Sequence, residues 1–149
     1  MDKLILFAAT GFGSGYLPVA PGTWGALVAL PIQFMLLMLP VNYYWPALSI
    51  IFIIAVATAG SAEKIFDKKD PGAVVIDEIF GMLIALIGAP ATPLAWGSAF
   101  LLFRLFDIWK PFPASWVDDH LNGGLGIVLD DVIAGGYALL CMQILSYYW

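Results

Sequence analysis

Charged side chains are scarce in this sequence. Lysine and arginine contribute 6 residues and aspartate and glutamate 11, which is 11% of the 149 residues. The chain is 62% hydrophobic, whereas a soluble domain is roughly half apolar and about a quarter charged. This composition excludes an ordinary water-soluble domain and predicts one integral membrane domain covering residues 1–149. The net charge of −5 argues against nucleic acid as a partner.

Cysteine and histidine are nearly absent. The single cysteine, Cys141, cannot form a disulfide within the chain and is expected to be a small buried hydrophobic residue. The single histidine, His120, excludes a zinc site built on paired histidines. It is either a solvated loop residue or a proton donor to a leaving group. The first apolar run, Leu4–Ala9, is short and is followed by no small-x-small cleavage site, so a removed signal peptide is not expected.

Five apolar runs, separated by loops that break helices, predict an all-α bundle of about five short transmembrane helices. Most runs are shorter than the roughly 20 residues that a perpendicular helix needs, so local thinning or interfacial residues must make up the difference. The glycine-rich N-terminal segment is expected to be interfacial or re-entrant. The runs are Trp24–Leu39, Pro46–Ser61, Val74–Gly88, Pro93–Ile108 and Val128–Ser146.

The charged residues determine the predicted topology. All of them fall in the N-terminal tail, in the connection 61–78 or in the connection 104–131. With five spans these segments lie on one side, which carries every lysine and arginine and is therefore cytoplasmic. The N-terminus is then inside and the C-terminus outside. Tryptophans are expected at both interfaces: Trp45, Trp96 and Trp149 outside, and Trp24, Trp109 and Trp116 inside.

Five carboxylates are expected at one level just inside the membrane. Asp77 and Glu78 begin the third run, Asp107 ends the fourth, and Asp130 and Asp131 begin the fifth. Four of them would lie at helix N-termini, where the macrodipole contributes under about 1 kcal/mol each, less than the cost of a poorly solvated carboxylate. They are either solvated helix caps or a cluster facing the bundle interior. The apolar residues around each pair favour a cluster, with one acid of each pair turned inward, and convergent hard oxygens favour Mg²⁺.

Few groups are available to bind a phosphate at such a site. Arg104 and Lys110, each three residues from Asp107, are candidates, although such spacings also occur between ordinary surface neighbours. The glycine-rich loop that leads to Gly22 and Thr23 offers backbone N–H groups and hydroxyls to an anion. Neither feature is specific by itself.

Three blocks of sequence are more specific than these single features. They are "GSGYLPVAPGTWGAL", "DPGAVVIDEIFGMLIAL" and "FRLFDIWKPFPASWVDDHLNGGLGIVLDDVIAGGYA", and they span most of residues 13–138. In content, order and spacing the blocks resemble the bacterial phosphatidylglycerophosphatase A family. The resemblance implies an all-helical, Mg²⁺-dependent phosphatase of the bacterial inner membrane. Its substrate would be phosphatidylglycerophosphate, a phospholipid, and its product phosphatidylglycerol.

The resemblance and the acids together give a hypothesis for the site. The carboxylates would bind one or two Mg²⁺ ions that hold the phosphomonoester at the cytoplasmic face, and one of them would orient the attacking water. Lys110 and Arg104 would neutralise phosphate oxygens, while Thr23 and Gly22 would contact the second phosphate or the glycerol. The candidate metal ligands are Asp77, Glu78, Asp107, Asp130 and Asp131, and the candidate catalytic residues are Asp77, Asp107 and Asp130.

Two other functional classes fit part of this pattern. A small ion or solute transporter should carry ionisable residues near the middle of the membrane or on both sides, and the outer halves of these runs have none. A non-catalytic scaffold subunit fits the small-xxx-small spacings of Gly81 with Ala85 and of Ala134 with Ala138. The enzyme is favoured over both. The number of metal ions, the division of roles among the acids, a covalent intermediate and a homo-oligomeric state stay open.

Overall fold

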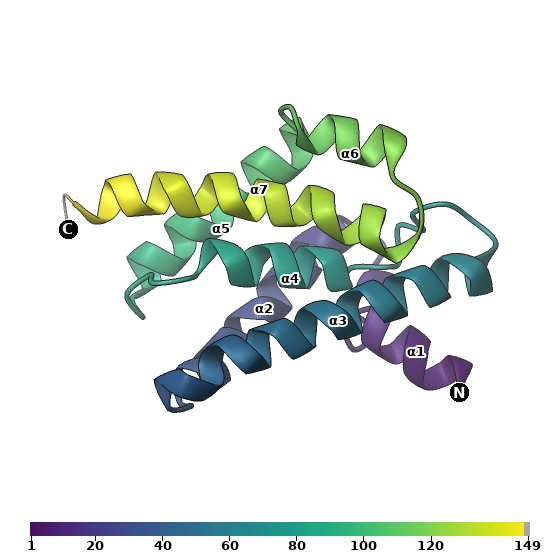
Figure 1. Ribbon diagram of the computed structural model, residues 1–149, viewed down its shortest axis with the longest axis horizontal. Coiled ribbons are helices and arrows are strands. Elements are labelled where there is room, and N and C mark those ends of the chain that lie inside the picture. The colour runs from purple at the N-terminus through teal and green to yellow at the C-terminus, as the bar shows by residue number, and fades with distance from the viewer. Residues whose placement is uncertain (148–149) are drawn as a thin grey trace.

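The computed structural model describes residues 1–147, and every regular element in that range is a helix (Figure 1). The predicted all-α class is therefore confirmed. Trp149, expected at the outer interface, lies outside the described residues. The elements are α1 (Asp2–Ala9), the 3₁₀ turn η1 (Ser14–Tyr16), α2 (Pro21–Leu37), α3 (Val41–Phe66), α4 (Ile76–Ala85), α5 (Pro93–Trp109), α6 (Ala114–His120) and α7 (Gly123–Ser146).

Local sequence signals explain several helix ends. Helices α2 and α5 begin with Pro21 and Pro93, and proline suits the first helical position because no N–H is needed there. The hydroxyl of Thr92 accepts a hydrogen bond of 3.2 Å from the backbone N–H of Ala95 and so caps α5. At its other end, Lys110 has φ 48°, a left-handed conformation that stops the helix.

Two helices, α3 and α7, are long and apolar enough to cross a membrane, and α2 is a shorter apolar helix. Large apolar side chains are exposed on the outside of the bundle; Met35, Ile53 and Ile144 are 65–67% exposed. Exposed apolar side chains in this number are unfavourable in water and expected in lipid. The structure therefore supports membrane association. Helix length and composition do not confirm the predicted five-span bundle.

Helix α4 is shorter than the predicted run 74–88. Its 10 residues rise about 15 Å, roughly half of the hydrocarbon core. The carbonyl oxygen of Leu86, just past the helix end, accepts a long hydrogen bond of 3.5 Å from Nε2 of Gln33. Gln33 is fully buried and also exchanges hydrogen bonds of 3.3 Å with the Tyr44 hydroxyl. These side chains provide partners at a helix end that lies away from water.

The glycines before the last predicted run are helical, so α7 begins at Gly123 rather than Val128. A Cβ built on Gly124 would lie 1.9 Å from the carbonyl oxygen of Val56 in α3, so the two backbones touch at this point. Glycine is needed there for close packing and does not mark a loop. Asp130 and Asp131 consequently lie well inside α7, and the prediction that they sit at a helix N-terminus is wrong.

Helix α7 is the central element of the bundle and packs against α3, α4, α5 and α6. Its contact with α4 is close: a Cβ on Gly135 would lie 2.2 Å from the carbonyl oxygen of Gly81. A Cβ on Gly81 would lie 2.6 Å from the backbone oxygen of Asp131. The small-residue spacing that begins at Gly81 therefore marks a contact within the chain, which brings Asp131 directly beside α4.

The charged segments lie toward one end of the bundle. In Figure 1 the N-terminus, the end of α3, α6 and the start of α7 are on the right. The α2–α3 turn, the α4–α5 connection and the end of α7 are on the left. Helix α6 was not predicted from the sequence, and its seven residues lie beside the start of α7.

Candidate functional site

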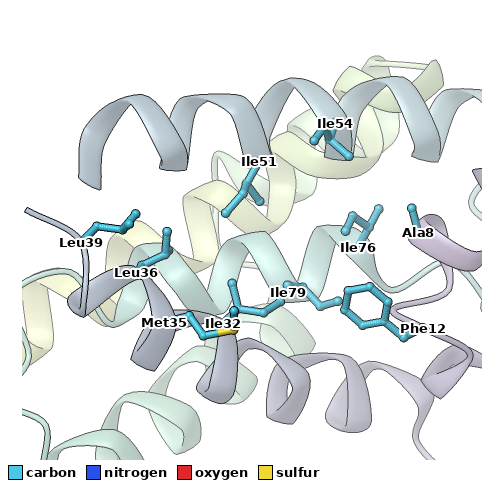
Figure 2. A pocket seen from close by; sticks show the side chains of 10 residues that line it. All are labelled: Ala8, Phe12, Ile32, Met35, Leu36, Leu39, Ile51, Ile54, Ile76 and Ile79. Carbon is cyan, nitrogen blue, oxygen red and sulfur yellow. The ribbon is translucent and has the colours of Figure 1, made fainter. Parts of the chain in front are cut away.

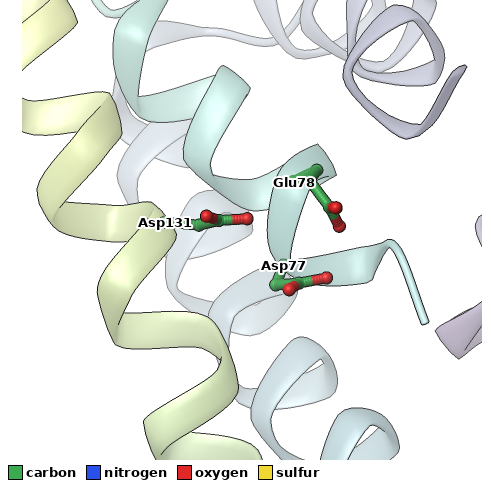
Figure 3. A group of neighbouring side chains, drawn as sticks. All are labelled: Asp77, Glu78 and Asp131. Carbon is green, nitrogen blue, oxygen red and sulfur yellow. The ribbon is translucent and has the colours of Figure 1, made fainter. Parts of the chain in front are cut away.

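Three of the five predicted acids meet where α4 packs against α7. Asp77 and Glu78 project from the first turn of α4, and Asp131 reaches toward them from α7 (Figure 3). Each side chain offers one carboxylate oxygen, and these oxygens lie within 4.8 Å of one another. Two oxygens bound to one small cation are separated by up to about 4–5 Å, twice the metal–oxygen distance. The three carboxylates are therefore close enough to share a cation.

Each acid of this group has one buried oxygen without a hydrogen-bond partner among the described residues. Asp77 is 7% exposed and Asp131 is 3% exposed. The buried atoms Oδ1 of Asp77, Oε2 of Glu78 and Oδ2 of Asp131 have no partner among the described residues. Burying carboxylate oxygens without compensation is strongly unfavourable. A divalent cation would supply the missing partner for all three, so this donor set fits a metal site.

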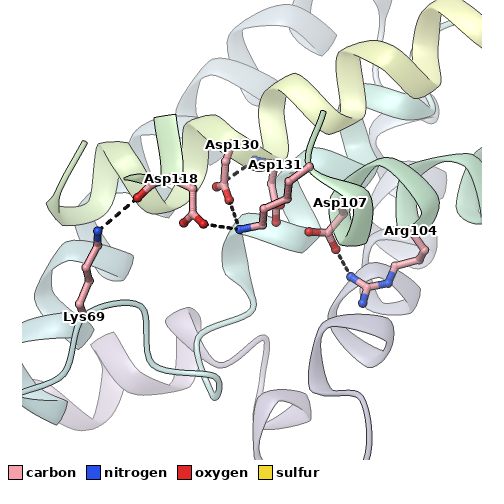
Figure 4. Close-up of polar contacts among 7 residues, drawn as sticks. Lys69, Arg104, Asp107, Asp118, Asp130 and Asp131 are labelled. Carbon is pink, nitrogen blue, oxygen red and sulfur yellow. Dashed lines mark hydrogen bonds and ion pairs between the residues drawn. The ribbon is translucent and has the colours of Figure 1, made fainter. Parts of the chain in front are cut away.

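Asp107 lies at the edge of the three-acid group and is paired with Arg104. The guanidinium Nη1 of Arg104 donates to Oδ2 of Asp107 (Figure 4). Asp107 is 9% exposed and lies within electrostatic reach of Glu78 and Asp131. The Nε of Arg104 is buried and has no acceptor among the described residues. Arg104 therefore offers an unused donor next to the acids.

The first turn of α2 meets the same group. A Cβ on Gly22 would lie 2.5 Å from Oε1 of Glu78 and 3.0 Å from Nη1 of Arg104. Thr23 follows in the same turn, and its backbone N–H donates to Ala20 at 2.9 Å. The absence of a side chain at Gly22 lets the positive end of the α2 dipole approach the site, where it favours an anion.

Asp130 is separate from the three-acid group and pairs with Lys110. The Nζ of Lys110 lies 2.7 Å from Oδ2 of Asp130 and 3.1 Å from Oδ2 of Asp118 (Figure 4). Burial alone lowers the pKa of Lys110, but the hydrogen bonds and charges of Asp130 and Asp118 outweigh it and raise the pKa above its usual value. Lys110 is therefore held in its charged form between α6 and α7.

Asp118 is the functional candidate that sequence reasoning missed. It lies in α6, and its backbone oxygen also accepts a hydrogen bond of 3.2 Å from Nζ of Lys69. Nothing in the local sequence distinguishes it from the neighbouring Asp119. His120, at the end of the same helix, is exposed and stacks on Trp116, and its Nδ1 lies 2.9 Å from the Trp116 oxygen.

The prediction that each acidic pair turns one member inward holds for α7 and fails for α4. In α7, Asp131 joins the cluster while Asp130 faces Lys110. In α4, both Asp77 and Glu78 join it. Side chains of successive residues diverge by about 100° around a helix. The longer side chain of Glu78 reaches back to the cluster through the space left by Gly22.

Comparison with known proteins gives one consistent family. The family described as Phosphatidylglycerophosphatase A matches residues 7–146. A protein of Escherichia coli (strain K12) named "Phosphatidylglycerophosphatase A" is 36% identical over 142 residues, which cover 95% of this chain and 83% of that protein. A Haemophilus influenzae protein of the same name is 37% identical over 142 residues, covering 94% and 87%.

A third relative carries a different name. A protein of Bacteroides thetaiotaomicron named "Putative phosphatidylinositol-3-phosphatase" is 35% identical over 148 residues, which cover 95% of this chain and 92% of that protein. No solved structure matches the chain.

Proposed function

Because the chain belongs to the phosphatidylglycerophosphatase A family, we propose that it hydrolyses the terminal phosphomonoester of phosphatidylglycerophosphate, leaving phosphatidylglycerol and phosphate. The observation that carries this proposal is the group of three buried carboxylates with unpartnered oxygens, beside Arg104 and the first turn of α2. A transporter or a scaffold subunit gives no reason for such a group to gather at one end of the bundle.

In this proposal Asp77, Glu78 and Asp131 hold Mg²⁺, with Asp107 at the edge of the site. A divalent cation in such a site supplies Lewis-acid stabilisation of the charge on the phosphoryl oxygens. Among the described residues, the ion pairs of these five acids are those of Asp107 with Arg104 and of Asp130 with Lys110. This excess of negative charge would repel a phosphate dianion, so binding of the substrate needs a further positive charge at the site.

Arg104 and Asp107 bind the phosphomonoester and activate the attacking water. In the reaction a water oxygen bonds to phosphorus, the ester P–O bond to the glycerol breaks, and the leaving oxygen takes up the proton that the water loses. Arg104, with its unused Nε donor, binds non-bridging oxygens of the phosphomonoester. Asp107, held in place by Arg104, orients the water and accepts its proton.

Lys110 and the first turn of α2 bind the rest of the headgroup. Lys110, positioned by Asp130, binds a phosphate oxygen and is a point charge with rotatable donors. Gly22 and Thr23 contact the diester phosphate or the glycerol through the positive end of the α2 dipole.

We further propose that the enzyme is a multi-pass protein of the bacterial inner membrane with the site at the cytoplasmic face. Helices α2, α3, α5 and α7 would cross the membrane, and α4 with the connection 86–92 would complete the fifth crossing. The exposed apolar side chains and the gathering of charged segments at one end support this arrangement. The acyl chains of the substrate could then stay in the inner leaflet while its phosphate reaches the acids.

Phosphate release from the purified protein in detergent tests the activity. We expect release from phosphatidylglycerophosphate that requires Mg²⁺ and stops when a chelator is added. Phosphatidylinositol 3-phosphate is the comparison lipid, since one relative is named "Putative phosphatidylinositol-3-phosphatase". Preference for that lipid would contradict the proposed substrate but not the proposed phosphatase activity. No phosphate release from either lipid in the presence of Mg²⁺ would contradict the whole proposal.

Metal binding has its own measurement. A ligand that binds only the folded state raises thermal stability by mass action. Mg²⁺ should therefore raise the Tm of the wild-type protein and have a much smaller effect on Asp131→Asn. An equal shift in both proteins would place the bound cation elsewhere.

A further inference from the structure

A groove lined only by apolar side chains lies beside the acid cluster, on another face of α4. Its volume is about 570 Å³, and α1, α2, α3 and α4, together with the residue Phe12 that follows α1, contribute to its walls. Figure 2 shows Ala8, Phe12 and Ile76 at one end and Leu39, past the end of α2, at the other. Ile79 of α4 also lines it. No acid, base or amide is among the lining residues.

We propose that this groove binds one acyl chain of the phospholipid substrate, and that the headgroup crosses the glycine-rich segment 11–22 to reach the acids. This inference rests on the proposed function and adds the site that holds the hydrocarbon part of the substrate.

The chemistry and direction of the groove fit an acyl chain. Its lining offers no hydrogen-bonding side chain, so the occupant gains only from burial of apolar surface. The end with Ala8 and Phe12 belongs to the charged end of the bundle, and the end with Leu39 belongs to the uncharged end. The groove therefore runs from the interface that carries the acids toward the membrane interior, as an acyl chain does.

The groove is continuous with the acid cluster through α4 and the glycine-rich segment. Ile76 and Ile79 stand directly before Asp77 and directly after Glu78, and about 100° of rotation per residue separates the apolar face from the acidic one. A Cβ on Gly11 would lie 2.9 Å from Cδ1 of Ile79, in the groove wall.

At the other end of the same segment, a Cβ on Gly22 would lie 2.5 Å from Oε1 of Glu78. Segment 11–22 thus passes from the groove to the site. The acyl chain and the phosphate would lie on different sides of α4, and a helix with its side chains is about 10–12 Å wide. The proposed substrate has a phosphodiester and a glycerol between its diacylglycerol and its terminal phosphate, and this spacer allows both ends to be bound together.

The test fills the groove without touching the acids. Ile54→Trp in α3 and Met35→Trp in α2 each replace an aliphatic side chain of the groove wall with a larger aromatic one. The two positions are 44% and 67% exposed, so neither substitution forces a ring into the core. Ile50→Trp is the matched control, because Ile50 is 56% exposed on α3 and is not among the residues that line the groove. The two substrates are diacyl phosphatidylglycerophosphate in mixed micelles and its water-soluble, deacylated headgroup.

We expect both groove variants to raise the KM for the diacyl lipid about tenfold, equivalent to roughly 1.4 kcal/mol, and to hydrolyse the deacylated headgroup like the wild type. Wild-type KM for the diacyl lipid would overturn the inference and assign the groove to bulk lipid. An equal loss of activity on both substrates would also overturn the inference, because it would show that the substitution disturbs the structure of the protein. If the wild-type protein hydrolyses neither substrate, the proposed function fails and this inference with it.

A second measurement uses the wild-type protein as its own reference. The KM should fall as the acyl chains of the substrate are lengthened, and Ile54→Trp should weaken that dependence. An unchanged dependence on chain length in the variant would also contradict binding in this groove.

Discussion

The two acidic pairs of this protein, Asp77–Glu78 and Asp130–Asp131, are alike in sequence and different in use. The pair in α4 gives both side chains to the three-acid group, and both keep a buried oxygen without a partner. The pair in α7 divides, because Asp131 joins the group while Asp130 binds Lys110 at 2.7 Å. The comparison teaches that the neighbouring elements, rather than the pair itself, decide whether an acid joins the three-acid group or pairs with a lysine of the chain.

The difference has a local cause. Lys110 ends α5 in a left-handed conformation, and its side chain lies between α6 and α7. Among the residues that the structure describes, the pair in α4 has no lysine partner. Its neighbours include Gly22, which has no side chain to fill the space, and Arg104, which is paired with Asp107.

The largest expected effect separates the two members of the α7 pair. Asp131→Asn, like Asp77→Asn, should lower kcat about 10³-fold, because each removes a proposed metal ligand worth several kcal/mol. Asp130→Asn should cost only about 10- to 100-fold, as for a residue that positions another group. Kinetics of the three variants with a Tm series in Mg²⁺ would measure this. Equal losses of kcat for Asp130→Asn and Asp131→Asn would contradict the different roles assigned to the two residues.

The next effect concerns the lysine that sets Asp130 apart. Lys110→Ala should raise the KM about 10- to 100-fold with a smaller change in kcat, since a hydrogen bond to a charged group is worth about 1.5–3 kcal/mol. Lys68→Ala, at an exposed lysine of the α3–α4 loop, is the control.

Removing Lys110 also leaves Asp130 buried without its partner, which lowers stability. The double variant Lys110→Ala/Asp130→Asn should regain the stability but not the KM. If Lys110→Ala leaves both KM and kcat unchanged, Lys110 does not belong to the site.

A third change tests the space beside the α4 pair. In Gly22→Ala the new methyl group would lie 2.5 Å from Oε1 of Glu78 and 3.0 Å from Nη1 of Arg104, so both side chains must shift. We expect kcat/KM to fall about tenfold, or roughly 1.4 kcal/mol. Gly97→Ala in α5 is the matched control, because a Cβ there meets nothing within 4 Å. Equal activity of the two variants would remove Gly22 from the site.

The smallest effect is expected at the second partner of Lys110. The side chain of Asp118 is 38% exposed, and an exposed ion pair contributes under about 1 kcal/mol. Asp118→Asn should therefore change KM less than about threefold while Asp130 still holds the lysine. A loss as large as that of Asp130→Asn would show that the two carboxylates are equivalent partners.

The part of the candidate site that could be predicted is the set of charged residues that stand within apolar sequence. Asp77, Glu78 and Asp131 are carboxylates within apolar sequence, a setting in which ionisable residues seldom occur without a function. Their convergence follows once the helices run between two ends of a bundle. The partner of Asp130 could not be predicted, because it depends on how the chain turns at Lys110 and on α6, whose short sequence has no clear helical pattern.

The fold was predictable in its class and less so in its helix ends. Apolar runs locate α2 and α5 within three residues. Helix α3 extends five residues beyond its predicted run at each end, and α4 stops early where Gln33 contacts Leu86 from another helix. The start of α7 was missed because glycine suggests a loop, whereas Gly124 is required by contact with Val56. The errors at the end of α4 and the start of α7 come from contacts between segments far apart in the chain, which local patterns do not contain.

The contact between Gly81 and Gly135 has a consequence for ion selection. With no side chain at either position, the axes of α4 and α7 approach closely, and Asp131 stands against Gly81 itself. If a cation lies among Asp77, Glu78 and Asp131, the spacing of these two helices would set how far Asp131 stands from the two acids of α4. Mg²⁺ binds oxygen at about 2.0–2.1 Å and Ca²⁺ at about 2.3–2.6 Å. A single methyl group added at Gly81 or Gly135 would push the two helices apart and would therefore favour the larger ion, Ca²⁺.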